Sequence, residues 1–177
     1  SFPNAKIGAA VAIDIKTGEV IALVSYPNYD PNLFASGTID NETWKELNPE
    51  YPHPKYPNRE DLDPTLPRPM LNNAITAAFP PGSTFKMIVG AAGMQEKVVG
   101  VTEKILDQGR YTKYSHIHGP ACWRWNDSRL THGWEDIIGA LRDSCNYYFY
   151  EVGDRLGIEK IEEYAKMFGL GVKSGIE

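Results

Sequence analysis

The sequence of 177 residues predicts a mixed α/β domain of the α+β kind, with an antiparallel sheet and a cluster of helices. Three observations lead to this fold class. Residues 8–25 hold two β-branched, apolar runs around a turn, residues 27–70 hold most of the prolines, and residues 71–177 show mainly helical periodicity. We expect all three stretches to form a single domain.

The first predicted element is a β hairpin. Residues 8–16 and 19–25 are rich in Val, Ile and Ala, and Gly18 between them suits a tight reversal. The tripeptide at residues 16–18 reads KTG. We interpret it as the hairpin turn, because turns are built from such residues.

Nine of the thirteen prolines follow between Pro27 and Pro69. Proline at this density blocks helices and central strands, so we expect an ordered irregular loop with one short helix near residues 41–47. The loop is either a surface connection or one wall of a substrate groove.

The remainder of the chain is predicted to be largely helical. The exception is a polar, aromatic segment at residues 106–130 that shows little periodicity. The predicted helices cover residues 70–79, 83–96, 134–143, 147–156 and 159–168.

Composition narrows the classes of function. A hydrophobic content of 42% supports globular folding, and a formal net charge of −5 argues against binding to nucleic acid or to an anionic membrane. The longest apolar runs, such as residues 9–13 and 20–24, are too short to span a membrane. Two cysteines, Cys122 and Cys145, leave room for one disulfide or for a metal site.

The stretch PPGSTFK at residues 80–86 is the strongest candidate for a catalytic motif. The prolines favour a helix start at this point, so Ser83 and Lys86 are expected on one helix face, where the amine reaches the hydroxyl. A serine needs a neighbouring base before it attacks a carbonyl, and a lysine acts as one when its pKa is depressed. An isolated SxxK is more often a capping serine beside a solvated lysine, so the context decides.

Together with SCN at residues 144–146, this motif resembles the transpeptidase domain of the penicillin-binding proteins. The resemblance covers nearly the whole chain and is closest to class B, the penicillin-binding protein 2 type. It includes, in the family's order, AVAIDIKTGEVIALVSYPNYDPNLF at residues 10–34, DQG at 107–109, HGW at 132–134 and FGLG at 168–171.

The resemblance implies the serine penicillin-recognising fold that β-lactamases share. In the family the FGLG stretch lies well inside the domain, and a KTG strand follows it. Residues 1–177 are therefore expected to be one partial domain, without the C-terminal part that carries KTG.

The implied reaction is acyl transfer by a peptidoglycan D,D-transpeptidase, with stem peptides as substrates and β-lactams as inhibitors. Ser83 would be the nucleophile and Lys86 the general base. Ser144 would relay a proton to the leaving amine, and Asn146 would bind Lys86 and the substrate amide. Three alternatives remain open: a β-lactam-sensing receptor, a β-lactamase-like hydrolase and a non-catalytic scaffold.

The resemblance also implies a location and partners. The domain would lie on the extracytoplasmic face of the cell membrane, with its anchor outside this chain. It would serve the machinery of cell-wall elongation or of sporulation.

A zinc site is the last implication of the resemblance. The sequence resembles some proteins of the penicillin-binding protein 2 type that bind zinc through an aspartate, a second acid, a histidine and the cysteine of SxN. Asp107, His132 and Cys145 match three of these positions, and Cys122 stands where the family has the second acid. His116 and His118 are rivals for the fourth place, while a Cys122–Cys145 disulfide and two inert thiols remain alternatives.

Overall fold

The computed structural model describes residues 5–48, 67–76, 78–115, 117–173 and 175. The chain divides into two compact units, Ser1–Phe79 and Pro80–Glu177, and each is described here by itself. The single domain expected over residues 1–177 stays a prediction.

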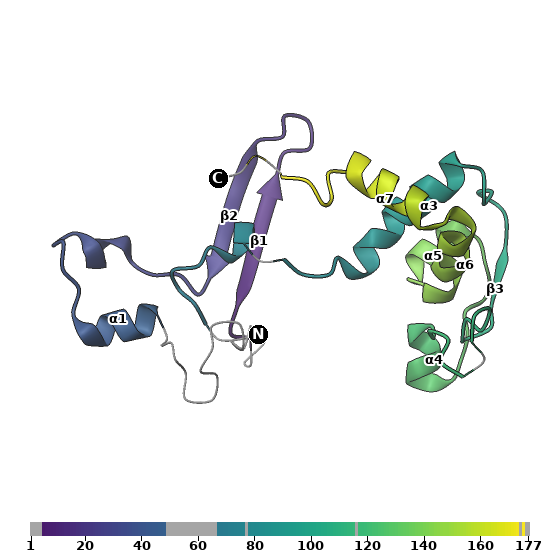
Figure 1. The fold of residues 1–177 in the computed structure, drawn as a ribbon, viewed down its shortest axis with the longest axis horizontal. Coiled ribbons are helices and arrows are strands. Elements are labelled where there is room, and N and C mark those ends of the chain that lie inside the picture. The colour runs from purple at the N-terminus through teal and green to yellow at the C-terminus, as the bar shows by residue number, and fades with distance from the viewer. Residues whose placement is uncertain (1–4, 49–66, 77, 116, 174, 176–177) are drawn as a thin grey trace. The chain divides into compact units, whose positions relative to one another are not determined.

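The first unit contains the expected hairpin. Strand β1, Gly8–Ile13, pairs antiparallel with β2, Val20–Tyr26, so that Gly8 lies opposite Tyr26 (Figure 1). The connection is a turn, as predicted: the Asp14 carboxylate accepts hydrogen bonds from two backbone N–H groups, and Gly18 has a φ of 77°.

The proline-rich stretch has a short 3-10 helix, η1, at Pro31–Phe34 and the predicted short helix, α1, at Asn41–Leu47. Asp40 caps α1 by accepting hydrogen bonds from two backbone N–H groups of its first turn. Residues 49–66 of this stretch lie outside the described residues.

The helix expected over residues 70–79 is much shorter in the structure. Helix α2 covers Asn73–Thr76 only. The Asn73 side chain donates to the carbonyl of Tyr26, and its backbone N–H donates to Ser25 Oγ. These contacts tie the segment to the hairpin. The prolines at positions 80 and 81 are not tolerated in the interior of a helix, so α2 cannot continue through them.

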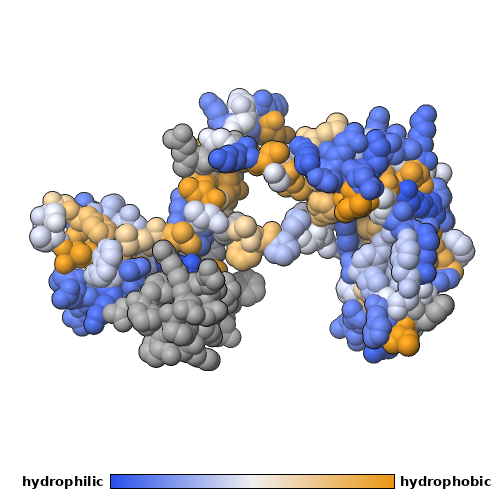
Figure 2. Space-filling view, viewed as in Figure 1, coloured by the Kyte–Doolittle hydropathy of each residue, from blue (hydrophilic) through white to orange (hydrophobic). Residues whose placement is uncertain are grey.

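The hairpin exposes apolar side chains on both of its faces. Every residue of β1 and all but one of β2 are exposed, and Figure 2 shows hydrophobic surface in this region. Ile21 is 70% exposed and Val24 53%.

The second unit holds the remaining helices, of which α3, α5, α6 and α7 gather into one cluster while α4 lies apart (Figure 1). Its elements are η3 at Gly82–Thr84, α3 at Phe85–Gln95, β3 at Ile105–Asp107, α4 at Trp123–Ser128, β4 at Gly133–Glu135, α5 at Ile137–Arg142, α6 at Asn146–Leu156 and α7 at Ile158–Met167. Together with the antiparallel hairpin, this confirms the expected α+β class.

Two predictions in this unit were wrong in detail. The segment at residues 106–130 contains the end of β3 and helix α4, and the helix expected from Trp134 begins only at Ile137. Trp134 lies instead in β4, opposite Leu106 of β3. Backbone pairing across about 30 residues of sequence therefore overrides the local helical pattern at Trp134. Asp136 then caps helix α5, which begins after the strand.

The core of the second unit forms where α3, α5, α6 and α7 pack on one another. Val152 and Ala92 are fully buried there, and Val99 is 2% exposed. Among the described residues, no helix is both long enough and apolar enough to cross a bilayer.

Glycine in α3 permits the close approach of α6. A Cβ at Gly93 would lie 2.6 Å from Val152 Cγ1 and 3.1 Å from Val99 Cγ1. We therefore expect Gly93→Ala to destabilise the protein by about 1–3 kcal/mol in urea unfolding, because the core is overpacked.

Gly153→Ala in α6 is the matched control, since its Cβ would meet only Ile161 Cδ1 at 3.6 Å. It should be neutral or stabilising by up to about 1 kcal/mol, through helix propensity. Equal midpoints for the two variants would contradict this account of the helix packing.

Candidate active site and metal centre

Ser83 lies where the chain enters helix α3, as the sequence predicted. It is the middle residue of η3, which continues directly into α3. Gly82 has a φ of 58°, a conformation that glycine adopts without steric cost. The Ser83 side chain is thereby presented at the surface, at the start of the helix.

Ser144 and Asn146 come from the short break between α5 and α6, also as predicted. Asn146 is the first residue of α6, and Cys145 precedes it as the N-cap. Ser144 has a φ of 51°, a left-handed conformation that costs a non-glycine residue on the order of 1 kcal/mol or more. Such a conformation persists only where the surroundings hold it.

Lys86 binds this loop through three hydrogen bonds. Its Nζ donates to Ser144 Oγ at 2.9 Å, to the Ser144 carbonyl at 2.7 Å and to Asn146 Oδ1 at 2.6 Å. Ser144 Oγ in turn donates to Ser83 Oγ at 2.9 Å. The four residues predicted as catalytic are therefore brought together by the fold.

The connection differs from the expected one in a single respect. Among the described residues, no direct hydrogen bond joins Lys86 to Ser83; Ser144 stands between the amine and the hydroxyl. The hydroxyl of Ser144 can accept a proton from one side and give one to the other. The arrangement can therefore move a proton between Ser83 and Lys86 in two short steps.

The environment of Lys86 makes its ammonium group easier to deprotonate than a solvated one. Partial burial lowers the pKa of the Lys86 amine, and this effect outweighs the opposing influence of the thiols of Cys122 and Cys145. A lysine with a lowered pKa can act as a general base. A pocket of about 350 Å³ opens beside it, lined by Ser83, Thr84, Lys86, Met87, Leu141 and Ser144.

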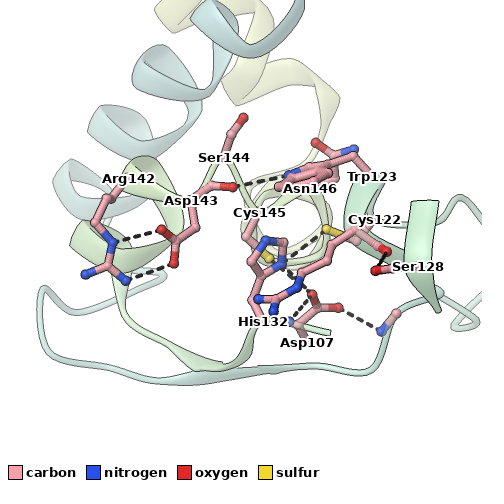
Figure 3. A network of polar contacts seen from close by, with 12 residues as sticks. Asp107, Cys122, Trp123, Ser128, His132, Arg142, Asp143, Ser144, Cys145 and Asn146 are labelled. Carbon is pink, nitrogen blue, oxygen red and sulfur yellow. Dashed lines mark hydrogen bonds and ion pairs between the residues drawn. The ribbon is translucent and has the colours of Figure 1, made fainter. Parts of the chain in front are cut away.

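A cluster of four potential metal ligands lies next to Ser144 and includes the following residue, Cys145 (Figure 3). Asp107 ends β3, Cys122 precedes α4, His132 precedes β4 and Cys145 precedes α6. One ligand atom from each lies within 4.8 Å of all the others. Pairing of β3 with β4, which sets Asp107 opposite Gly133, brings the aspartate beside the histidine.

Three distances within the cluster can be compared with those around a tetrahedral metal ion. His132 Nδ1 lies 2.8 Å from Asp107 Oδ2 and 3.5 Å from Cys122 Sγ, and Cys145 Sγ lies 3.7 Å from Asp107 Oδ2. Zinc bonds of about 2.0–2.3 Å place tetrahedral ligand atoms about 3.3–3.8 Å apart. Two of the three distances fall in this range and the third is shorter.

The burial of the cluster is also what a closed structural site requires. Cys122 and Cys145 are fully buried and unbridged, and the side chains of Asp107 and His132 are 1% and 2% exposed. Burial raises the pKa of the Cys145 thiol far above its usual range. A bound divalent cation would reverse this effect, because it stabilises the thiolate.

The pKa of the Asp107 carboxyl group is lowered, in contrast to that of the Cys145 thiol. Burial disfavours its charge, but hydrogen bonds from the backbone N–H groups of His132 and Gly109 and from the His132 side chain lower its pKa overall. The carboxylate is therefore ionised at neutral pH. An ionised carboxylate, an imidazole and two cysteines are a donor set suited to zinc.

The rivals for the fourth ligand position fare differently. His118 is exposed and lines another pocket, together with Tyr111 and Tyr150, so it stands apart from the cluster. His116 lies outside the described residues.

Sequence reasoning did not anticipate the contact that Trp123 makes with the Ser144 loop. Its Nε1 donates to the backbone carbonyl of Asp143 at 3.2 Å, and its ring meets the His132 ring edge-on, 5.5 Å between centroids. The position of Trp123 directly after a candidate ligand was the only signal in the sequence.

Comparison with known proteins identifies the family. Residues 8–177 match the penicillin binding protein transpeptidase domain. Peptidoglycan D,D-transpeptidase MrdA of Acinetobacter baumannii is 33% identical over 171 residues, which are 96% of this chain and 22% of that protein. The chain thus spans about a fifth of the length of this curated relative.

Solved structures agree with the family in sequence and fold. The Pseudomonas aeruginosa PBP2 complex with WCK 5153 is 33% identical, with a TM-score of 0.74, over 94% of this chain and 33% of that one. The complex of Helicobacter pylori PBP2 with MreC is 28% identical, with a TM-score of 0.77, over 96% of this chain and 28% of that one. The chain belongs to the penicillin-binding protein transpeptidase family, and within it to the penicillin-binding protein 2 type.

Proposed function

We propose that this chain contributes the nucleophile and the proton relay of a peptidoglycan D,D-transpeptidase that forms cell-wall cross-links. The observation that carries the proposal is the hydrogen-bonded series from Lys86 through Ser144 to Ser83. The family and the relatives named D,D-transpeptidase support the same activity.

In the proposed reaction, Ser83 Oγ attacks the carbonyl of the penultimate D-alanine of a stem peptide. Its proton passes through Ser144 toward the neutral amine of Lys86, and returns by way of Ser144 to the nitrogen of the departing D-alanine. The acyl group then passes from Ser83 to the amine of a neighbouring strand, which restores the free hydroxyl. A β-lactam would acylate the same oxygen.

Binding and charge stabilisation complete the proposed site. Asn146 holds Lys86 through its amide oxygen and leaves its NH₂ group for the substrate amide. The backbone N–H of Ser83 at the helix start would supply one half of the oxyanion hole. In the family a KTG strand supplies the other half.

We also propose a structural zinc ion held by Asp107, Cys122, His132 and Cys145. When bound, the ion would fix the position of Cys145 and so hold the residues on either side of it. The proton relay itself would need no cofactor.

Location and partners follow from the family and remain proposals. The site would act on the extracytoplasmic face of the cell membrane, where stem peptides are found. The Helicobacter pylori relative solved in complex with MreC supports a partner in cell-wall elongation, and sporulation machinery is the alternative.

Removal of the nucleophile tests the proposal first. Ser83→Ala, in the protein at its full natural length, should abolish covalent labelling by a fluorescent penicillin and the release of D-alanine from a stem peptide. Ser128→Ala is the matched control, because the Ser128 hydroxyl bonds only within α4, to the Arg124 carbonyl. Undiminished labelling of Ser83→Ala would refute the assignment; labelling of the wild type without D-alanine release would refute the transpeptidase activity.

The lowered pKa of Lys86 predicts a pH dependence. The neutral amine is the base, so the acylation rate should rise as pH rises through that pKa and then level off. Because the pKa is lowered, the rise should be centred below 10.5, the ordinary value for lysine. Rates measured with a chromogenic β-lactam check this, and a rise centred at or above 10.5 would contradict it.

The zinc proposal predicts about one equivalent of metal per protein by elemental analysis. Cys122→Ser should reduce the metal content and the melting temperature, whereas His118→Ala should leave both unchanged. A chelator should destabilise the wild type. Metal-free protein that keeps its fold and its acylation rate would rule the site out, and absence of free thiols at Cys122 and Cys145 would favour the disulfide instead.

A further inference from the structure

Trp123 lies between the ligand cluster and the loop that carries Ser144 (Figure 3). Its indole Nε1 donates to the Asp143 carbonyl at 3.2 Å, across 20 residues of sequence. Its ring lies against His132 in a T-shaped contact. One side chain therefore touches both a candidate metal ligand and the residue before Ser144.

The Asp143 carbonyl needs a partner of this kind. Asp143 is the C-cap of α5, and the last carbonyls of a helix have no N–H donor within the helix. The next residue turns into the left-handed region, with a φ of 51°. A hydrogen bond to this carbonyl fixes the peptide plane that leads into Ser144.

The following carbonyl is held from another element. Lys86 Nζ, on α3, donates to the Ser144 carbonyl at 2.7 Å. The two peptide planes that flank the Ser144 Cα are therefore fixed independently, one by Trp123 and one by Lys86. Together they fix the direction of the Ser144 Cα–Cβ bond, and the hydroxyl oxygen that this bond carries lies 2.9 Å from Ser83 Oγ.

Hydrophobic burial does not account for Trp123. Its surface is 47% exposed, in contrast to the fully buried Cys122 beside it. Its contact with His132 is also specific: His132 Nδ1 faces Asp107, while Nε2 is buried without a hydrogen-bond partner among the described residues. Ring packing by Trp123 therefore adds to the Asp107 contact in restraining the orientation of the imidazole.

We propose that Trp123 is a positioning residue. Its hydrogen bond to the Asp143 carbonyl aligns Ser144 for the proton relay, and its ring contact links this alignment to the His132 ligand. The proposal rests on the proposed transpeptidase function. Trp123 does not contact the reacting atoms, so its effect is on the rate of acylation rather than on the binding of the β-lactam.

The experiment separates these two quantities in the protein at its full natural length. Acylation rates at increasing concentrations of a chromogenic β-lactam give the rate constant of acylation and the dissociation constant of the initial complex. Trp123→Phe keeps a ring and removes the N–H. It should lower the acylation rate constant on the order of tenfold, the equivalent of one hydrogen bond, with the dissociation constant changed less than about twofold.

A second substitution guards against a folding defect. Benzothienylalanine at position 123 keeps the two-ring shape and replaces the N–H by sulfur. It should reproduce the loss of acylation rate while the melting temperature and the metal content stay at wild-type values. Trp123→Ala removes the ring as well, and should in addition speed the loss of metal to a chelator, because His132 loses its packing.

Trp134→Phe is the matched control, since Trp134 is 64% exposed and lies in β4. It should acylate at the wild-type rate. The inference is overturned if the benzothienylalanine variant acylates at the wild-type rate. It is also overturned if the lower rates of the position 123 variants are fully explained by a smaller fraction of folded protein. If the wild-type protein itself is not acylated, the proposed function fails instead, which is a distinct result.

Discussion

The site depends on one series of hydrogen bonds, which joins the Lys86 amine to the Ser83 hydroxyl through Ser144. Its two ends lie three residues apart, where η3 continues into α3, but its middle member comes from a loop about 60 residues later. The series exists only because α3 packs on α5 and α6 at close range. Glycine at position 93 permits the approach to α6, so the packing of the core sets the geometry of the chemistry.

The backbone of the loop that supplies Ser144 is strained, and it keeps this conformation because the loop is held from several sides. Lys86 holds it from α3, Trp123 holds it from α4, and Cys145 ties it to the ligand cluster. A metal ion held by this cluster would act on the proton relay by fixing the loop, without taking part in the chemistry or contacting a substrate.

Local features of this fold could be predicted from the sequence. The hairpin turn at Gly18, the helix start at Ser83 and the helix break at Ser144 each have a short-range signal, and all three were found in place. Long-range features could not be predicted in this way. Pairing of β3 with β4 placed Trp134 in a strand, and the Trp123 contact joins residues with no common pattern.

The account is tested most directly by peptide mapping. The protein at its full natural length is exposed to a penicillin, digested and analysed by mass spectrometry. We expect a single covalent adduct, on the peptide that contains Ser83 and at that residue. An adduct at Ser144, at a cysteine or nowhere would contradict the claim that the relay activates the Ser83 hydroxyl.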